Sequence, residues 1–405
     1  MQILSAFKYE LMPNGEQVRD MRRTAGACRF VFNKALALQN ENYRNGGKFI
    51  TQFSMEKHLT AWRNAPNTPW LKDSPRSAQN KAIEDLDRAF KNFFEKRADF
   101  PCFKRKGQSV DSFRSPDKKA ITLDAANGRI KLPKLGWMRY RNSRVVLGDL
   151  RNVTVSNKGG RWYASILTQR EVEQPTPQGP AVGIDVGIAR FATLSDGSHV
   201  DPLNALKKHA ARLAKYQRRM SRKTKFSNNW KKAKARVQKI HTGIANARND
   251  FLHKASTTIS KNHALVCIED LQVGNMSKSS AGTSEAPGKK VAQKSGLNKA
   301  ILDQGWFEFR RQLEYKTAWR SGFMVAVPAA YTSQTCPCCG HVAKENRKTQ
   351  AIFACVSCGY SNNADQVGAI NVLERGQRLF ACGGTAQSGH PSKQEPTEVT
   401  QAELV

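Results

Sequence analysis

The hydrophobic pattern divides the first hundred residues into a short strand and a helical block. Residues 7–11 alternate apolar and polar side chains, which predicts a strand that stops at the turn-forming Pro13-Asn14-Gly15. From Glu16 to about Phe100, apolar residues recur at steps of three and four, the spacing of one helix face. Pro101 ends this block, because a residue that precedes proline disfavours the helical backbone.

The pattern over residues 101–170 is typical of β-strands. Two apolar-rich runs, 153–155 and 162–166, flank Asn157-Lys158-Gly159-Gly160, which predicts a hairpin. Prolines at 175, 177 and 180 then predict a linker. A second domain is therefore expected to start at Ala181.

The second domain contains two buried-strand patterns that each include an acid. Residues 181–187 are apolar apart from Asp185, and residues 264–268 lead directly into Glu269. Residues 277–291, rich in Ser, Gly and Lys, predict a loop, and a helix follows it. Beyond Gly383 the apolar pattern is lost, so residues 384–405 are expected to be a disordered tail.

The net charge of the chain limits the classes of partner that it can bind. Among 405 residues, 66 Lys and Arg oppose 33 Asp and Glu, a formal net charge of +33, while 39% of residues are hydrophobic. Such a chain can fold, and its charge indicates a polyanionic partner such as nucleic acid. No apolar run is long enough to cross a membrane, so a soluble intracellular protein without a membrane partner is expected.

The positive charge is concentrated between Lys207 and Lys239. This segment holds fourteen basic residues and no acid, and its apolar residues keep a helical spacing. Like charges at this density repel each other unless an anionic partner lies along them. Tyr216, Phe226 and Trp230 are interleaved and could stack on bases, although they could equally be core residues.

Cysteines near the C-terminus have the spacing of a metal site. Cys336 and Cys339 form one C-x2-C pair, and Cys355 and Cys358 form a second pair fifteen residues later. Each pair is followed by a glycine that permits a tight turn, and four thiolates complete a closed tetrahedral zinc site. A closed site leaves no open position, so this zinc is expected to be structural. Cys338 lies inside the first pair and could replace one ligand.

Three acids in different contexts are candidates for catalysis. Asp185 lies within a strand, Glu269 ends a strand, and Asp365 opens a predicted helix after Asn362-Asn363-Ala364. Acids that converge from separate elements suit Mg²⁺, and phosphodiester hydrolysis commonly uses two such ions. Acids at strand ends are more often simply solvated, but an unpaired charge within an apolar strand is costly. Pattern alone leaves both interpretations open.

Several motifs together resemble the TnpB (OrfB) family of transposon-encoded proteins, which are related to CRISPR type V effectors. The resemblance covers residues 5–383. It is specific because the order and spacing of the motifs agree as well as their residue types. The motifs that carry it are Gly183-Ile184-Asp185-Val186-Gly187, Ile268-Glu269-Asp270-Leu271, the two Cys-Gly knuckles with Asn363-Ala364-Asp365, Cys28–Asn33, Asp250–Lys254 and Arg310–Lys316.

The resemblance implies an α/β architecture built on a RuvC-like nuclease domain of the RNase H fold. That domain would comprise residues 181–334 and 361–383, with a zinc-ribbon insertion at 335–360 that binds target nucleic acid. Residues 1–15 and 101–180 would form a β-barrel wedge, and residues 16–100 a helical recognition lobe.

The resemblance also implies an activity and its cofactors. Asp185, Glu269 and Asp365 map to the catalytic acids that bind two Mg²⁺, and Cys336, Cys339, Cys355 and Cys358 map to the structural zinc ligands. Family members bind a guide RNA made from the transposon end and cut double-stranded DNA beside a transposon-adjacent motif. A monomer on one RNA, in a bacterial or archaeal cytoplasm and associated with the nucleoid, is therefore expected.

Two alternatives stay open at this point. An unguided transposase or resolvase of the RNase H fold would need the same three acids, whereas a DNA-binding regulator would need none of them. The chain departs from many relatives after the third acid, where Val367-Gly368-Ala369 replaces an Asn-Ala-Ala sequence. Recognition of the adjacent DNA motif would fall to the N-terminal half, with Trp70–Phe94 and Asp111–Arg114 as candidates.

Overall fold

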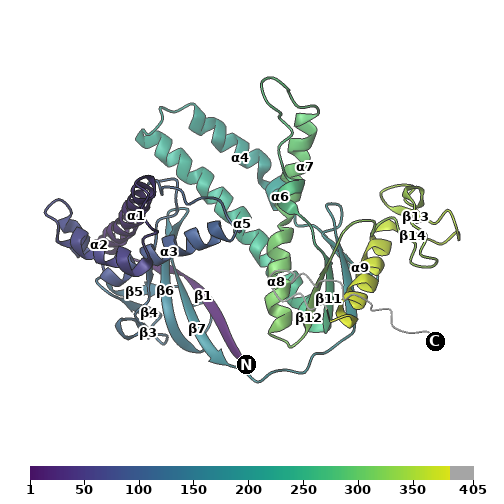
Figure 1. The fold of residues 1–405 in the computed structure, drawn as a ribbon, viewed down its shortest axis with the longest axis horizontal. Helices are drawn as coiled ribbons and strands as arrows, with labels where there is room; N and C mark the ends of the chain where they lie inside the picture. Colours follow the sequence, from purple (N-terminus) through teal and green to yellow (C-terminus); the bar gives the residue numbers. More distant parts are fainter. Residues whose placement is uncertain (384–405) are drawn as a thin grey trace, which may run out of the picture. The chain divides into compact units, whose positions relative to one another are not determined.

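The computed structural model describes residues 1–383, so the expected tail at 384–405 lies outside the described residues. Contacts divide the chain into two units (Figure 1). The N-terminal unit comprises Met1–Glu173 and Tyr216–Thr242, and the C-terminal unit comprises Gln174–Lys215 and the described residues from Gly243 onward. Residues 216–242 thus group with the N-terminal unit, whereas the sequence assigns them to the nuclease domain.

The helical block of the N-terminal unit begins at a capped helix start. The Asn14 side chain accepts a hydrogen bond from the Gln17 backbone N–H at 2.8 Å, and the Gln17 side chain accepts from the Asn14 backbone N–H. Apolar side chains from these helices share one hydrophobic core with the neighbouring sheet. The helices are α1 (Gly15–Arg44), α2 (Gln52–Asn64), the 3-10 helix η1 (Pro69–Asp73) and α3 (Arg76–Phe94).

The sheet of the N-terminal unit has seven strands in the order β2-β6-β7-β1-β5-β4-β3. Residues 2–10 of β1 pair with β7, and Leu11 and Met12 pair with β5, so β1 connects the two halves of the sheet. Its strands are β1 (Gln2–Met12), β2 (Ser112–Ser115), β3 (Thr122–Asp124), β4 (Arg129–Leu132), β5 (Gly136–Tyr140), β6 (Asp149–Lys158) and β7 (Arg161–Glu171), with the 3-10 helix η2 (Lys118–Ala120) between β2 and β3.

Two details of this sheet bear on the sequence-based expectations. The predicted hairpin is β6–β7, and its turn residues Gly159 and Gly160 both have positive φ, 62° and 84°. The resemblance implies a barrel, but among residues 1–383 the hydrogen-bonded ladder is open, with β2 and β3 at its edges. These two strands have four and three residues, and they do not pair with each other.

The C-terminal unit is built on a mixed five-stranded sheet with the order β10-β9-β8-β11-β12. β10, β9 and β8 pair antiparallel, and β8, β11 and β12 pair parallel. The strands are β8 (Ala181–Val186), β9 (Ala192–Leu194), β10 (His199–Val200), β11 (Leu265–Glu269) and β12 (Phe323–Val327).

The remaining elements are mostly helices. No helix in the described part of the chain is long and apolar enough to cross a membrane. The helices are α4 (Ala205–Ser221), α5 (Asn228–Asn262), α6 (Val273–Met276), α7 (Val291–Gln304), α8 (Trp306–Ala318), the 3-10 helix η3 (Lys344–Asn346) and α9 (Ala364–Ala381), and a two-stranded sheet pairs β13 (Ile352–Ala354) with β14 (Ser361–Asn363).

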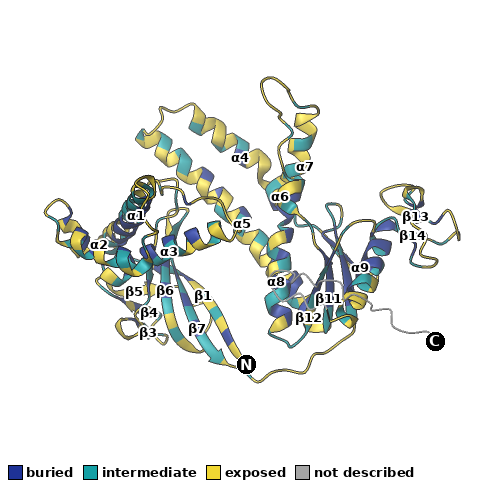
Figure 2. Cartoon of the chain, in the orientation of Figure 1, coloured by how far each residue is buried: buried dark blue, intermediate teal, exposed yellow. Residues whose placement is uncertain are grey.

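Alternate residues of the central strands face different helices. Ile184 and Ile268 lie in a core with Phe309 and Leu313 of α8, whereas Cys267 lies in a second core with Val372 of α9. Because side chains alternate along a strand, odd-numbered residues of β8 and β11 face α9. Most residues of both strands are buried, and Figure 2 shows this in the dark blue colour near the β11 label.

Candidate active site and metal centre

Asp185 and Glu269 lie side by side on the central strands, on the face that α9 covers. Ile184 of β8 pairs with Ile268 of β11 in parallel register, so the next residue of each strand is the acid. Neighbouring parallel strands are about 4.8 Å apart, and side chains at matching positions point the same way. The fold therefore brings these two sequence-predicted acids together.

The third acid, Asp365, lies in the first turn of α9. The Asn363 side chain caps this helix by accepting hydrogen bonds from the backbone N–H groups of Asp365, at 3.0 Å, and Gln366, at 3.4 Å. One turn later, a Cβ on Gly368 would lie only 3.0 Å from the Asp185 carboxylate oxygen. The start of α9 thus lies directly against Asp185, and Asp365 belongs to the same cluster of acids.

Burial and the neighbouring charges raise the pKa values of Asp185 and Glu269. Burial, followed by the charges of Glu269 and Asp365, raises the pKa of Asp185 to about 7, against a lowering effect of Arg347. Burial also raises the pKa of Glu269, which is 9% exposed. The Arg347 guanidinium lies 3.8 Å from an Asp365 carboxylate oxygen. The three acids therefore form a concentration of negative charge that favours a bound cation.

Residues outside the predicted set hold Glu269 in place. The Thr332 hydroxyl donates a hydrogen bond of 2.6 Å to Glu269, which favours the charged carboxylate. The Asn371 side chain of α9 donates to the backbone carbonyls of Thr332, at 2.7 Å, and Thr335, at 2.8 Å. Arg375 of α9 donates to the carbonyl of Ala330 at 2.6 Å. Helix α9 thereby fixes the loop that carries Thr332.

Sequence reasoning did not identify Thr332, Arg347 or Arg375 as site residues. Thr332 and Arg347 come from loops, and no spacing rule relates a loop threonine to an acid sixty-three residues earlier. Arg375 does offer a signal, because it lies ten residues after Asp365 in the same helix. A basic residue on the helix that carries the third acid is a sequence signal for a residue near the acidic cluster.

The four outer cysteines form the candidate metal centre. Their sulfurs all lie within 4.8 Å of one another, and the Cys336–Cys358 and Cys339–Cys355 pairs are both 3.6 Å apart. A tetrahedral zinc with Zn–S bonds of about 2.3 Å needs sulfurs about 3.8 Å apart, so the geometry fits. Cys338 is exposed and does not belong to this group. The structure thus brings together the expected four.

The turns of the knuckles favour bound thiolates. Gly340 and Gly359 have φ of 74° and 75°, a left-handed conformation that glycine adopts without a steric cost. The backbone N–H of Cys358 donates to the Cys355 sulfur at 3.5 Å. Such backbone donors lower the pKa of the Cys355 thiol to about 6. Among residues 1–383, the four cysteines are the group of Cys, His, Asp or Glu side chains whose ligand atoms lie close enough together to hold one metal ion. The carboxylates of the three acids are farther apart than these sulfurs.

The metal centre and the third acid share a small core. Cys336, Phe353 and Cys355 pack with Ala364 and Val367 of α9. β14, which pairs with β13 of the cysteine module, runs directly into α9. The cysteine module therefore supports the helix turn on which Asp365 lies. Val367 stands at the first position of the Asn-Ala-Ala sequence that many relatives have, and here it belongs to this core.

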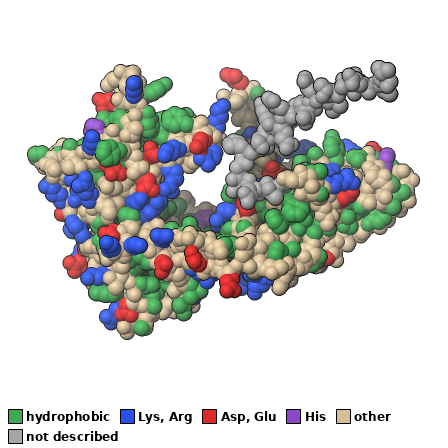
Figure 3. Space-filling model, turned by 60° about the horizontal axis from the view of Figure 1, so that its bottom comes forward, with side chains coloured by type: hydrophobic (Ala, Val, Ile, Leu, Met, Phe, Trp, Pro, Cys, Tyr) green, Lys and Arg blue, Asp and Glu red, His purple; other side chains and the backbone are tan. Residues whose placement is uncertain are grey.

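The basic segment forms α4, the first part of α5 and a six-residue connection between them. Arg219, Arg222, Lys223, Lys232 and Arg236 line an open groove of about 470 Å³ beside Tyr216. Both helices are largely exposed, as the yellow colour of α4 and α5 in Figure 2 shows. Lys and Arg side chains are also spread over the face drawn in Figure 3, with fewer acids between them.

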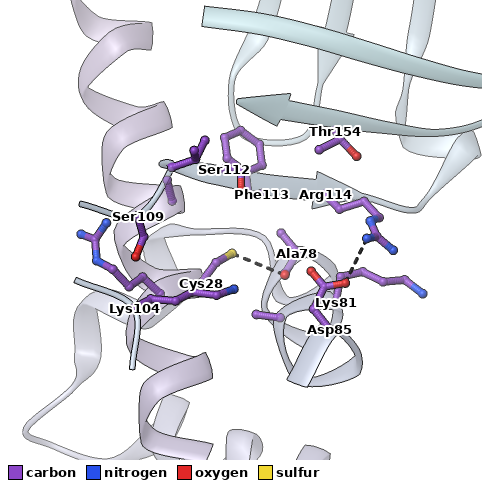
Figure 4. Close-up of a pocket in the computed structure, with 14 residues that line it drawn as sticks. Cys28, Ala78, Lys81, Asp85, Lys104, Ser109, Ser112, Phe113, Arg114 and Thr154 are labelled. Carbon is purple, nitrogen blue, oxygen red and sulfur yellow. Dashed lines mark hydrogen bonds and ion pairs between the residues drawn. The ribbon is translucent and has the colours of Figure 1, made fainter. Parts of the chain in front are cut away.

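The candidates for recognition of the adjacent DNA motif are partly used inside the N-terminal unit. A cavity of about 150 Å³ between α1, α3 and β2 is drawn in Figure 4. At its wall, Arg114 pairs with Asp85 at 2.9 Å, Asp111 pairs with Arg29 at 2.5 Å, and Phe113 is buried. Three residues of the 111–114 candidate thus make internal contacts that stabilise this unit.

Comparisons with known proteins agree with the resemblance. A family described as "Probable transposase", OrfB_IS605, matches residues 164–280, and a "Cas12f1-like, TNB domain" matches residues 306–372. A "Helix-turn-helix domain" of OrfB proteins matches residues 1–48, where the structure has β1 and α1.

Relatives match over the whole chain. The "Putative RNA-guided DNA endonuclease InsQ" of Escherichia coli is 56% identical over 99% of this chain and 100% of that protein. The "Putative RNA-guided DNA endonuclease" of Streptomyces pristinaespiralis is 33% identical over 98% of both chains. A solved structure titled "Structure of the mini-RNA-guided endonuclease CRISPR-Cas_phi3" is 10% identical over 93% of this chain and 92% of that chain, with a TM-score of 0.43, too low to bear on the fold. On the full-length matches, the chain belongs to the TnpB (OrfB) family.

Proposed function

We propose that this chain is a transposon-encoded, RNA-guided endonuclease that cleaves double-stranded DNA next to a transposon-adjacent motif. The observation that carries the proposal is the convergence of Asp185, Glu269 and Asp365 at one end of the central sheet. Full-length relatives named as RNA-guided DNA endonucleases support the same activity. The chain would act in the cytoplasm, in association with the nucleoid.

The acids would hold two Mg²⁺, and the donor set fits these ions. Mg²⁺ prefers carboxylate oxygens. Burial, together with the charges of Glu269 and Asp365, raises the pKa of Asp185 to about 7, so at higher pH the three carboxylates would favour cations over further protons. When bound, such ions supply an activated water and stabilise charge on the phosphate. Thr332 would keep Glu269 ionised and oriented, and Arg347 would limit the repulsion around Asp365.

The mixed sheet supports a RuvC-like nuclease domain of the RNase H fold. Two of the acids occupy adjacent central strands, and the third starts the helix that packs on them. The zinc module at 335–360 would contact target nucleic acid, and its zinc would be structural because all four ligand positions are protein thiolates. The seven-stranded sheet and the helices α1–α3 would be the wedge and the recognition lobe.

The net charge supports a guided mechanism. Base pairing between guide and target reads the sequence, so the protein mainly needs a positive surface for the nucleic-acid backbone. The formal charge of +33 and the unpaired cations of the basic segment supply it.

RNA dependence separates this function from that of an unguided transposase or resolvase. The gene should be expressed with its native downstream DNA, and the RNA that copurifies with the protein should be sequenced. A single species from the 3′ end of the gene that continues into flanking sequence is expected. Random cellular RNA, or none, would favour the unguided enzyme.

A further inference from the structure

The connection between α4 and α5 holds an exposed aromatic residue in a strained backbone conformation. Phe226 has a φ of 71° and is 67% exposed. The Ser227 N–H donates to the Thr224 carbonyl at 3.1 Å, which closes a turn with Phe226 at its third position. Glycine is the residue that usually occupies such a position, and a bulky side chain there is an outlier. Both the strain and the exposure destabilise the free protein.

The surroundings of Phe226 are aromatic and cationic. Its ring meets the Trp230 ring edge to face, with centroids 5.5 Å apart. The Lys225 ammonium lies 5.3 Å from the Phe226 centroid, and the Lys234 ammonium lies 5.2 Å from the Trp230 centroid. The turn is also anchored, because the Ser227 hydroxyl accepts a hydrogen bond from the backbone N–H of Trp230 at 3.2 Å. The pair therefore forms a fixed apolar surface rimmed by positive charge.

The cations of this region lack acidic partners. Within residues 1–383, none of the fourteen basic side chains between Lys207 and Lys239 forms an ion pair with a carboxylate, although such pairs occur throughout the rest of these residues. In the groove that Lys223 and Asn229 also line, the Arg219 and Arg236 guanidinium groups lie 5.6 Å and 5.9 Å from the centroid of the Tyr216 ring. An anionic ligand with flat apolar parts matches both the unpaired charge and the exposed rings.

We propose that the tip of the α4–α5 hairpin binds an unpaired nucleotide, with its base stacked on Phe226 and its flanking phosphates in the groove beside Tyr216. Base–aromatic stacking tolerates any sequence, and cationic grooves follow the phosphate backbone. A base pair inside a duplex has both faces covered and cannot stack in this way. The ligand is therefore an unpaired stretch of RNA or DNA, and its chemistry is a nucleobase with adjoining phosphates.

This inference rests on the nucleic-acid binding of the proposed function and not on cleavage. A protein that binds no oligonucleotide at all would fail the proposed function. A protein that binds well, but without any contribution from Phe226, would fail only this inference. Direct binding measurements on the full chain separate the two cases.

The test measures binding of labelled 12-nucleotide RNA and DNA strands and of a blunt duplex, together with quenching of 2-aminopurine placed in the strands. Phe226→Ala should bind the single strand about 5- to 150-fold more weakly and lose the quenching. Phe226→Trp should restore both. The blunt duplex should be bound about equally by all variants, because its contacts are mainly to phosphates.

Two further variants control for stability and for exposed rings in general. Phe226→Gly fits the left-handed backbone, so it should keep the fold and still lose single-strand affinity. Phe307→Ala removes a 72% exposed phenyl ring from α8 and should leave binding unchanged. Loss of quenching in the RNA arm or the DNA arm supports the proposal and identifies the strand. Unchanged quenching in both arms, or an equal loss of duplex binding, would overturn it.

Discussion

At the scale of single residues, Asp185 is the acid whose charged form the fold disfavours most clearly. Its carboxylate lies against Gly368 of α9, and its pKa is raised to about 7 by burial and by the two neighbouring acids. Without a bound cation, ionisation of the Asp185 carboxyl group lowers the free energy of unfolding. A bound cation would offset that loss. The stability of the protein without magnesium should therefore report the cluster directly.

Replacing Asp185 with Asn should stabilise the magnesium-free protein at alkaline pH. The pKa of the Asp185 carboxyl group is 3.8 in the unfolded chain and about 7 in the folded protein. The folded state therefore loses stability as the pH rises between these two values. The variant lacks this loss and should be more stable by up to about 4 kcal/mol at pH 8. Urea unfolding with zinc retained would measure the difference, which should shrink at pH 5. A difference that does not change between pH 5 and pH 8 would contradict the account.

Thr332 should affect activity through Glu269. Thr332→Val removes the 2.6 Å hydrogen bond that favours the charged carboxylate, so the pKa of Glu269 should rise further. Cleavage at pH 7 should fall by about tenfold, consistent with a lost hydrogen bond to a charged group. The pH profile of cleavage should shift upward, and Thr332→Ser should restore it. An unshifted profile would mean that Thr332 acts only on the loop structure.

At the scale of elements, α9 organises the site through close contact with the sheet. A Cβ on Gly183 would lie 2.1 Å from the Ala369 carbonyl oxygen, and a Cβ on Gly376 would lie 2.2 Å from the Cys267 sulfur. Glycines at these positions let the helix approach β8 and β11 closely. Its first turn also packs on the cysteine module, so one helix joins the metal centre to the acids.

Gly183→Ala should therefore destabilise the protein, because the clash is with backbone. A cost of about 1–3 kcal/mol is expected for such overpacking. Gly243→Ala is the matched control, since Gly243 lies in α5 with nothing within 4 Å of its Cβ position. That control should be stabilised by about 0.5–1 kcal/mol. Thermal unfolding of both variants measures this, and equal stability would show that α9 can move away from β8.

Removal of Cys355, one of the four proposed zinc ligands, should lower cleavage indirectly. Cys355→Ser is expected to release the metal and loosen the core that supports the first turn of α9. Metal content should fall from one zinc per chain, and the magnesium concentration needed for cleavage should rise. Cys338→Ser is the control and should keep the zinc, because Cys338 lies outside the tetrad. Full cleavage by zinc-free protein at the same magnesium concentration would contradict this coupling.

The elements that the sequence predicted well are those with strong local patterns. The apolar runs around Asp185 and before Glu269 are strands, and the helix after Asp365 is present. Local patterns could not predict that Gln2 pairs with Glu171, because that register depends on the whole sheet. They also could not place Thr332 or Arg347, which reach the acids from loops. The apolar residues around Lys231 predict a helix, but their spacing does not show which unit that helix joins.

At the scale of the whole molecule, charge is the dominant property. The basic residues outnumber the acidic ones twofold, and the basic segment leaves its cations without carboxylate partners in the described part of the chain. A protein of this kind gains affinity mainly by releasing counterions from phosphates. Its binding to nucleic acid should depend strongly on salt.

Binding affinity should fall linearly with the logarithm of salt concentration. Arg219→Ala should reduce the slope by about 0.7 if that side chain contacts one phosphate of a single strand. Lys254→Ala is the control, because Lys254 is already paired with Asp250 at 2.8 Å. Titrations between 50 and 400 mM salt would measure both slopes. A flat titration of the unchanged protein would rule out a surface that follows phosphates.

The most direct test of the central claim is plasmid cleavage by the protein purified with its own RNA. Targets should match or mismatch the guide portion of that RNA, and magnesium should be present. Cleavage of the matched target alone is expected, with a loss of at least about a hundredfold in Asp185→Asn, Glu269→Gln and Asp365→Asn, whose target binding should persist. Glu374→Gln, on the exposed part of α9, should cut normally. Equal cleavage of matched and mismatched targets, or undiminished cleavage by the three acid variants, would contradict the account.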